Sequence, residues 1–366
     1  YSIMTAPSEE ERLEAMRQRD SIAILQQEAQ ARQAEMASLQ EATAQDDSLS
    51  AEILNLDPSS RDSLMQHNMR DRMGYFSNAA IGDEGHYVIE NDLLRLEISR
   101  KGGNVHTVML HDFYTFEKEP LFLKTGEDNV FSLNFFSGNR QINSSQLFFN
   151  GFTPDQRFSG EDQIRVSGND SLAFSLRAYT DLHTPENPSY LEFLYTLSGN
   201  SYMVGFDINF VGTRDIIPAN TTLINLDWQS NLPRLEKNRT NEQTNSTVFY
   251  KYVNDDVSKL RETRDGAERL TSSVHWISFK QQFFSATLIS EQGFLSADIS
   301  SRKAADEDED IIKHMAASIN LAFDARQDNR YPMRFYFGPN HYQTLRSFDL
   351  DLERQIPLGW GFFLMS

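Results

Sequence analysis

The sequence predicts a mainly β protein: a large two-sheet sandwich, preceded by a helical spacer and followed by an amphipathic helix. From His86 onward, apolar and polar residues alternate with a period of two, which is typical of half-buried strands. The strand-like runs are short, recur about every 8–12 residues, and are not separated by helical patterns. They are too numerous for one small immunoglobulin-like unit, and 26 Phe and 13 Tyr supply material for a larger core.

Composition narrows the possible functions. The chain has 366 residues, a net charge of −19 and no cysteine. Disulfides, thiolate catalysis and cysteine metal sites are therefore excluded, and a surface this negative disfavours nucleic acid as a partner. No run approaches about 18 apolar residues, so no transmembrane helix is expected. Both ends are apolar, "YSIM" and "LGWGFFLM", as expected for a piece from between two membrane segments or for buried termini.

Residues 1–45 are predicted to form a helical spacer. Ser8 and Glu11 fit a capping box, and no Gly or Pro follows until Gln45. The apolar stripe is thin, which predicts a solvated helix or a weak coiled coil; its members are Ile22, Leu25, Ala29, Met36 and Leu39. Residues 46–85 are polar and are expected to be a linker.

Strands are predicted through residues 86–338. In "YVIENDLLRLEISRKGG", Leu94, Leu96 and Ile98 point to one face, and Gly102-Gly103 ends the run. A second strand resumes in "NVHTVMLHDF". Further strands are expected near residues 131–136, 145–149, 164–166, 172–179, 190–197, 202–210, 222–228, 246–252, 274–279, 283–289, 293–299, 317–323 and 331–338.

The stretch "VHWISFKQQFFSATLI" at 274–289 is rich in apolar residues yet carries several polar ones. Trp276, Ser278 and Lys280 share one face of a strand, and the intervening residues share the other. Both faces are partly apolar, which predicts a strand covered on both sides. Gln281-Gln282 breaks the alternation, so we expect a bulge or corner before a second strand.

The stretch "NHYQTLRSFDLDLERQ" is predicted to form one closing helix that ends at Pro357. Its apolar face is expected to pack on the sandwich; the members of this face are Tyr342, Leu345, Phe348 and Leu352. The residues after it are expected to approach a bilayer, where aromatic side chains favour the interface; these are Ile356, Trp360, Phe362 and Phe363.

No catalytic, metal or cofactor site is predicted. The eight His residues are scattered without HxH or HExxH spacing, and no GxSxG, P-loop or GxGxxG occurs. "ADEDED" at 305–310 lacks the Gly and Glu of a calcium loop. An aldose-epimerase-like site needs a His acid and a Glu base, for which His183 with Glu192, or His275 with another carboxylate, are the available pairs. An ordinary polar strand residue is the default at each position.

Four stretches occur in a fixed order: "VIENDLLRLEISRKGG" (88–103), "WISFKQQFFS" (276–285), "FGPNHYQTL" (337–345) and "LERQIPLGW" (352–360). Together they resemble the signatures of the large periplasmic domain of YidC-type membrane protein insertases, over about residues 86–362. The resemblance and the helical face give the structural and interaction candidates: Trp276, Gln281, Gln282, Phe283, Phe284, Gly338, Pro339, Tyr342, Leu345, Phe348, Leu352, Glu353, Gly359 and Trp360.

The resemblance implies a twisted, galactose mutarotase-like β-super-sandwich at 86–338, followed by a helix and a membrane-proximal segment at 339–366. It places the domain on the periplasmic face of the bacterial inner membrane. It implies SecD/SecF and the Sec translocon, nascent membrane proteins and the protein's own transmembrane domain as partners, without nucleic acid. Insertion requires lowering the cost of moving polar segments through lipid, so no enzyme activity or cofactor is expected. The alternative is a carbohydrate-binding or aldose-epimerase-like sandwich.

Overall fold

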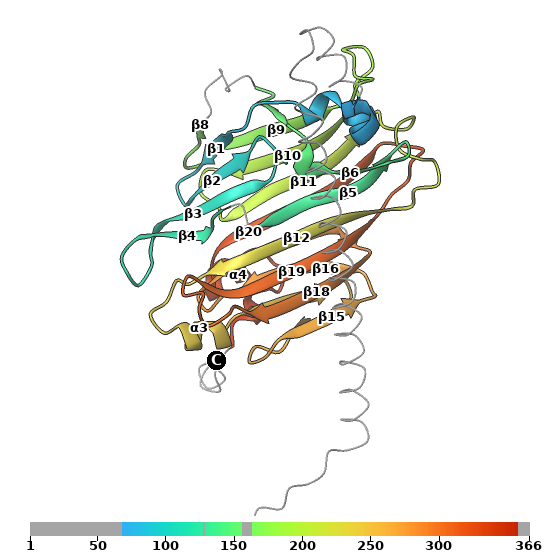
Figure 1. The fold of residues 1–366 in the computed structure, drawn as a ribbon. Coiled ribbons are helices and arrows are strands. Elements are labelled where there is room, and N and C mark those ends of the chain that lie inside the picture. The colour runs from blue at the N-terminus through green and yellow to red at the C-terminus, as the bar shows by residue number, and fades with distance from the viewer. Residues whose placement is uncertain (1–67, 127–128, 156–162, 358–366) are drawn as a thin grey trace, which may run out of the picture.

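The protein is a twisted β-sandwich of two layers (Figure 1). The computed structural model describes residues 68–126, 129–155 and 163–357. One layer is a nine-stranded antiparallel sheet. The other consists of a five-stranded and a six-stranded sheet, which meet where β4 lies beside β12. The predicted large, mainly β sandwich is confirmed.

The five-stranded sheet opens the domain, in the order β4-β3-β2-β1-β8. Burial alternates residue by residue along β2, as its sequence predicts. Gly102 and Gly103 then turn the chain with φ values of +88° and +64°, in the left-handed region that favours glycine. The strands are β1 (His86–Glu90), β2 (Leu94–Ser99), β3 (Val105–Tyr114), β4 (Pro120–Lys124) and β8 (Gln163–Arg165).

The other two sheets contain the longest strands. In spatial order the nine-stranded sheet comprises β14 (Val257–Lys259), β13 (Thr247–Tyr252), β16 (Val274–Lys280), β17 (Phe284–Phe294), β20 (Asn329–Pro339), β11 (Met203–Val211), β10 (Tyr190–Ser198), β9 (Ser171–Tyr179) and β7 (Asn150–Phe152). The six-stranded sheet comprises β15 (Gly266–Leu270), β18 (Ser296–Lys303), β19 (Ile311–Ala322), β12 (Leu223–Pro233), β5 (Val130–Ser137) and β6 (Arg140–Asn143).

The main core fills the space between the layers and is rich in aromatic rings. Trp228 of the six-stranded sheet stacks on Phe279 of the nine-stranded sheet, with ring centroids 3.8 Å apart. Phe131 meets Phe206 and Phe335 edge to face. Such pairs contribute about 0.5–1.5 kcal/mol beyond the area they bury, so these contacts fix how the two layers sit on each other.

Some local predictions are wrong. The expected strand near 145–149 is instead the 3₁₀ turn η3 (Ser144–Gln146), because the Asn143 side chain accepts a hydrogen bond from the Ser145 amide and stabilises a turn. Strands β4, β6, β14 and β15 were not expected, nor was the short helix α3 (Arg239–Thr244). These elements are short, so periodicity has few residues on which to act.

The N-terminal part of the described chain belongs to the domain. The predicted spacer and most of the predicted linker lie outside the described residues. From residue 68, however, the chain is helical to residue 73 and continues through η1 (Gly74–Phe76) and η2 (Asn78–Ala80). Met73, Phe76 and Ala79 are buried in the main core. The linker boundary at residue 85 is therefore wrong, because a segment with three core residues is not a linker.

The predicted single C-terminal helix is also wrong. The chain forms α4 (Tyr342–Arg346) and, after a break, the 3₁₀ turn η4 (Leu352–Gln355). Asp349 and Asp351 separate them with φ values of 56° and 59°, a left-handed conformation that Asp tolerates better than most residues. The break redirects the chain across the sheet. Among the described residues, no helix is long and apolar enough to cross a membrane.

Phe76→Ala is expected to destabilise the domain by about 3–5 kcal/mol, because Phe76 is fully buried and meets Phe135 edge to face. Chemical denaturation of the 366-residue chain measures this loss. Tyr75→Ala, at the more exposed neighbouring position, is the control and should cost far less. Equal, small effects would show that residues 68–80 are peripheral after all.

Candidate functional site

The nine-stranded sheet has a second apolar cluster on the face turned away from the main core. Four neighbouring strands β13, β16, β17 and β20 supply its floor, formed by Phe249, Trp276, Ile289 and Tyr336. Residues 340–357, called the C-terminal segment below, supply its cover with Leu345, Leu350 and Leu352. The prediction that the strand at 274–280 is covered on both sides is therefore confirmed.

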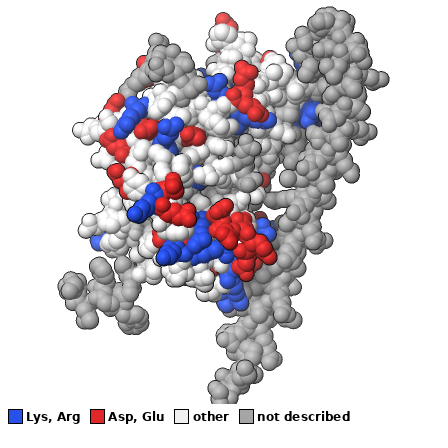
Figure 2. Space-filling model, turned by 60° about the vertical axis from the view of Figure 1, so that its left-hand side comes forward, with Lys and Arg blue, Asp and Glu red and all other residues white. Residues whose placement is uncertain are grey.

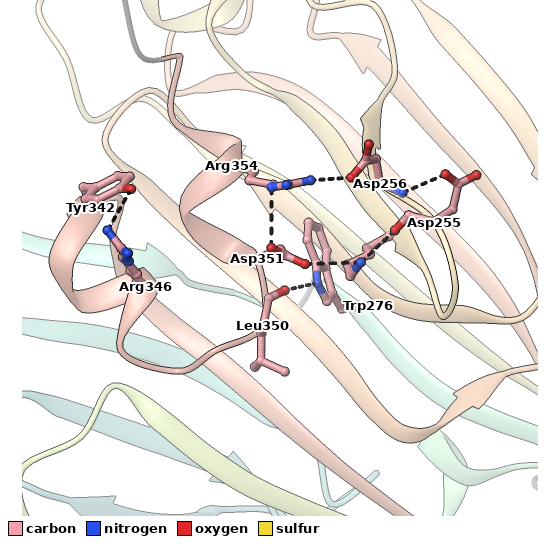
Figure 3. Close-up of polar contacts among 9 residues, drawn as sticks. Asp255, Asp256, Trp276, Tyr342, Arg346, Leu350, Asp351 and Arg354 are labelled. Atoms are coloured by element: carbon pink, nitrogen blue, oxygen red, sulfur yellow. Dashed lines mark hydrogen bonds and ion pairs between the residues drawn. The ribbon is translucent and has the colours of Figure 1, made fainter. Parts of the chain in front are cut away.

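Trp276 lies at the centre of this second cluster and is fully buried. Its indole Nε1–H donates to the main-chain oxygen of Leu350 at 2.9 Å (Figure 3). Leu345 and Leu352 are also fully buried, while Phe348 meets Tyr336 edge to face, with ring centroids 5.7 Å apart. The C-terminal segment is thus held by both apolar packing and a buried hydrogen bond.

Ion pairs line the rim of the cluster (Figure 3). Lys251 Nζ lies 3.3 Å from a carboxylate oxygen of Asp351 and donates to the main-chain oxygen of Asp255. Arg354 pairs with Asp256 across the gap to the β13–β14 turn and with Asp351 on its own segment. Pairs this exposed contribute about 0–1 kcal/mol each, so they orient the segment more than they stabilise it.

Two of the sequence motifs meet at the β16–β17 turn, Gln281–Phe284, called the QQFF turn below. The Gln281 amide donates to the main-chain oxygen of Phe284 at 2.8 Å. Asn340, at the start of the C-terminal segment, donates its main-chain amide to Phe283 O and its side-chain amide to both Gln281 O and Phe284 O. The predicted corner at Gln281-Gln282 is confirmed, and Asn340 is a residue that the sequence reasoning missed.

Gly338 and Pro339 bring the chain into the C-terminal segment. A Cβ atom on Gly338 would lie 2.8 Å from the Tyr336 hydroxyl and 2.9 Å from the Tyr202 ring, so only glycine fits without displacing a ring. The Tyr336 hydroxyl donates to the main-chain oxygen of Pro339 at 2.6 Å. This motif therefore fixes where the chain leaves β20.

Side chains of the QQFF turn also bind the end of β12 and helix α3. Gln281 is buried, and its Nε2 donates to the main-chain oxygen of Pro233 at 2.7 Å. The Gln282 side chain accepts from Asn241 of α3 at 3.2 Å. The paired glutamines thus connect the turn to the opposite layer of the sandwich, which explains why two long polar side chains stand next to an apolar strand.

Helix α3 carries a buried carboxylate. Glu242 accepts hydrogen bonds from the amides of Leu235 and Glu236 at 3.1–3.2 Å. Burial raises the pKa of Glu242 to about 7, although the two backbone hydrogen bonds oppose the shift and the negative Glu236 adds to it. Glu242 therefore holds the β12–α3 loop with a group that titrates near neutrality.

Two buried lysines lie at the other end of α3. Lys280 Nζ donates to the main-chain oxygen of Asn245 at 2.8 Å, and Lys313 Nζ donates to the main-chain oxygens of Ser246 and Glu262. Burial lowers the pKa of each lysine to about 8. The ammonium groups satisfy carbonyls at a helix C-terminus, where cations are favoured.

Exposed aromatic side chains gather at this end of the sandwich. Phe283 is 52% exposed at the tip of the QQFF turn, and Tyr114 and Phe116 are exposed where β3 turns toward β4. We call these three residues the aromatic rim. Phe113, next to Tyr114, meets Phe284 edge to face at 5.2 Å. The Phe116 amide donates to Leu235 O, two residues after the Pro233 carbonyl that binds Gln281.

The surface around the aromatic rim carries both signs of charge. Figure 2, which brings the left-hand side of Figure 1 forward, shows basic and acidic side chains lying next to each other. Arg234 lies over the Phe116 ring at 4.8 Å, and Arg239 is 3.6 Å from Asp306. A partner that docks here meets aromatic rings among mixed charges.

The His–Glu pairs required by the epimerase alternative are not brought together as an acid and a base. Glu192 accepts hydrogen bonds from Ser175, Arg177 and Asn209. Burial alone would raise the pKa of Glu192, but these bonds and the Arg177 charge bring it below its usual value. His183 Nδ1 accepts from the Ser189 amide at 3.1 Å. Glu192 is thus the stable anion of a structural network.

The pKa of His275, the other candidate, is shifted away from the protonated form that a catalytic acid needs. This residue is partly buried on β16, and burial lowers its pKa, with Lys251 adding to the effect, although Glu291 and Asp351 partly oppose the shift. Among the described residues, no group of three or more His, Asp or Glu side chains could hold a metal ion.

The structure shows how the predicted interaction residues are buried. Trp276, Gln281, Phe284, Leu345 and Leu352 are buried, whereas Phe283 is exposed. Two packing predictions are wrong: Tyr342 lies outside the second cluster beside Arg346 (Figure 3), and Ile356 packs against the cluster instead of continuing past it. Glu353 is half-buried on η4. Gly359, Trp360, Phe362 and Phe363 lie outside the described residues.

The family model and the curated relatives that match this chain point to the same family. The model of the YidC periplasmic domain family matches residues 86–366. The membrane protein insertase YidC of Parabacteroides distasonis is 33% identical over 311 residues, covering 82% of this chain and 46% of that protein. A Bacteroides fragilis protein of the same name is 28% identical over 370 residues, covering 98% and 52%. The chain thus spans about half the length of these curated relatives.

Solved structures with a similar arrangement are much more distant in sequence. A putative aldose 1-epimerase from Escherichia coli has a TM-score of 0.39 and 10% identity, covering 70% of this chain and 100% of that chain. A galactose mutarotase-like protein from Lactobacillus casei has a TM-score of 0.41 and 10% identity, covering 69% and 100%.

Leu345→Asp is expected to destabilise the domain by about 3 kcal/mol or more, because it places a carboxylate in the second cluster without a partner. Denaturant unfolding of the 366-residue chain measures the loss. Gln343→Asp adds the same charge at an exposed position of α4 and should have little effect. If the two variants unfold at the same denaturant concentration, the C-terminal segment does not stabilise the sheet.

Glu242→Gln is expected to change how stability depends on pH. Between about pH 4.5 and 7, native Glu242 holds a proton that the unfolded chain has released, so the free energy of unfolding falls as pH rises. The glutamine variant lacks this loss and should be more stable than the parent at pH 7.5, by about 1–3 kcal/mol, but not at pH 4. Denaturant unfolding at several pH values across this range tests the prediction, with the exposed Glu117→Gln as the control. If the stability of Glu242→Gln changes with pH as that of the parent does, Glu242 is not the group that titrates.

Proposed function

The chain belongs to the family of YidC periplasmic domains, and we propose that it serves a membrane protein insertase as a docking and positioning domain without enzymatic activity. Its place is the periplasmic face of the bacterial inner membrane. The names of the curated relatives describe an insertase, and nascent membrane proteins are the corresponding clients. In this proposal the domain assists their insertion and folding through the membrane part of the protein.

The observation that supports positioning is the attachment of the C-terminal segment to the sheet. Three buried leucines, the Trp276 hydrogen bond and the Arg354 ion pairs hold the segment up to η4. A chain anchored by a whole cluster has one orientation relative to the domain, because releasing it would expose apolar area worth about 1.5–3 kcal/mol per large side chain. In the proposal, Gly359 and Trp360 then carry the chain to the lipid–water boundary, which favours Trp.

The observation that supports docking is the aromatic rim. Aromatic residues that are exposed while their neighbours anchor them are typical of protein interaction sites. Phe283 is exposed, but Gln281 and Phe284, at the two ends of the turn, are buried, so the turn presents the ring without losing its own position. We propose that SecD/SecF, and through them the Sec translocon, dock on this rim.

The proposed role requires no covalent catalysis. An insertase lowers the cost of moving polar groups into lipid, which calls for surfaces and orientation rather than a nucleophile or a cofactor. The most highly connected carboxylate of the large sheet, Glu192, is held as a structural anion. Docking and positioning are what the described surfaces can supply.

Site-specific photocrosslinking in the full-length protein tests the docking site. A photoreactive phenylalanine at position 283 should crosslink to SecD or SecF in membranes, because the ring it replaces would lie in the interface. The photoreactive phenylalanine placed at position 182 is the control. Leu182 is similarly exposed but follows β9 and is not part of the aromatic rim. Phe283→Ala should weaken co-purification without lowering the melting temperature. Crosslinks of equal yield from both positions, or from neither, would contradict docking at the aromatic rim.

A further inference from the structure

Four asparagines stand opposite one another across the outer face of the six-stranded sheet. The four strands that carry them, β6, β5, β12 and β19, are adjacent, and β18 follows β19 (Figure 1). The pairing places every member directly opposite the next, and the row ends in a serine. Its members, called the asparagine row below, are Asn143, Asn134, Asn225, Asn320 and Ser296. Because neighbouring strands lie about 4.8 Å apart, the row presents polar groups at that interval.

Hydrogen bonds between neighbours hold the amides in place. Asn143 donates to the Asn134 side-chain oxygen at 2.9 Å, and Asn134 donates to Asn225 at 3.4 Å. Asn320 donates to the Ser296 hydroxyl at 3.0 Å. A side-chain amide can make about four hydrogen bonds, and these residues are only half-buried. Asn143, Asn134 and Asn225 each donate two side-chain hydrogen bonds within the protein. The row is therefore pre-organised, and what it presents toward solvent is mainly amide oxygen.

An apolar row runs beside the asparagine row. Phe136 and Leu223 lie two residues along from Asn134 and Asn225, so they share the outer face, and Leu223 pairs with Ala322 of β19. Phe136 is 50% and Leu223 47% exposed, and Leu295, directly before Ser296, is 48% exposed. Large apolar side chains this exposed on one sheet face indicate a contact surface.

A second polar row flanks the asparagine row on the side away from the apolar row, and its charged side chains are mostly paired with each other or hydrogen-bonded. It consists of Ser132, Asp227, Ser318, Asp298 and Arg269. Asp298 is paired with Arg269 at 2.7 Å, and Asp227 accepts a hydrogen bond from Asn134 at 2.9 Å. On a chain with a net charge of −19, this nearly neutral face offers no strong attraction to phosphates or carboxylates.

The rows end in a surface hollow of about 490 Å³. Ser296 and Asn320 of the asparagine row, Arg269 and Asp298 of the second polar row, and Thr271, Leu295 and Ala297 line it. Its size is within the range of small-molecule sites, and such sites combine apolar walls with a few placed polar groups.

We propose that this face binds an uncharged oligosaccharide lying across the strands, with one end in the hollow. The amide oxygens can accept from sugar hydroxyls, and the Asn320 amide, which makes one donation, to Ser296, has a second N–H for a sugar oxygen. The apolar row offers contact to the C–H face of pyranose rings. An extended peptide fits less well, because its backbone groups pair with the open edge of a sheet, whereas the asparagine row is on a face. The inference stands apart from insertase docking, which concerns the opposite end of β16 and β17.

Calorimetric titration of the 366-residue chain with a neutral β-1,4-linked N-acetylglucosamine pentamer, and with a neutral glucose pentamer, tests the proposal. At least one should bind saturably. Asn225→Ala combined with Asn320→Ala should weaken binding at least tenfold, because each lost hydrogen bond is worth about 1 kcal/mol. Phe136→Ala, at an exposed position, should weaken it independently of any effect on folding.

Gln292→Ala is the matched control, since Gln292 is an exposed amide on β17 of the other layer. This variant should bind the pentamer as tightly as the parent chain does. Melting curves confirm that each variant is folded. The proposal is overturned if neither pentamer binds, or if the double asparagine variant and Phe136→Ala bind as the parent does. It is also overturned if an uncharged extended octapeptide binds at these residues and the sugars do not.

Discussion

The burial of Trp276 on the outer face of β16 is the constraint on which the rest of the structure depends. An indole in a sheet face needs an apolar cover and a hydrogen-bond acceptor, because an unpaired buried N–H costs about 1–3 kcal/mol. The C-terminal segment supplies both, through its leucines and Leu350 O. A straight helix could not place Leu345, Leu350 and Leu352 over one ring while offering a main-chain carbonyl, which accounts for the left-handed break at Asp349 and Asp351.

The same strand carries polar side chains whose burial determines the neighbouring elements. Lys280 is almost fully buried, and its ammonium donates to the Asn245 carbonyl after α3 and lies over the Phe249 ring. At the next residue, Gln281 ties the turn to Pro233, and Glu242 fixes the loop from there. Buried polar groups without partners are strongly destabilising. Each such group therefore requires a specific neighbour, and together they place the QQFF turn and its exposed Phe283.

The two layers of the sandwich thus present different surfaces. The nine-stranded sheet hides its outer face at the second cluster beneath the C-terminal segment and leaves Phe283 exposed at its end. The six-stranded sheet leaves its outer face open and fills it with amides in register. A covered face fixes the position of a chain, whereas a face with exposed side chains can bind a ligand, so the two proposed roles use different layers of the same fold.

Periodicity in the sequence determined the sandwich and the individual long strands, because alternation along a strand is a local property. The family was indicated separately, by the resemblance of four ordered motifs. Periodicity also indicated that the strand at 274–280 is covered on both sides. Only the tertiary structure decided what covers it: Asn340 was not singled out, and Tyr342 and Ile356 were assigned to the wrong surroundings. It also decided that residues 68–80 belong to the core and that four asparagines from four strands form a row. These outcomes depend on pairing register and on contacts between residues distant in the chain, and neither leaves a periodic signal in the sequence.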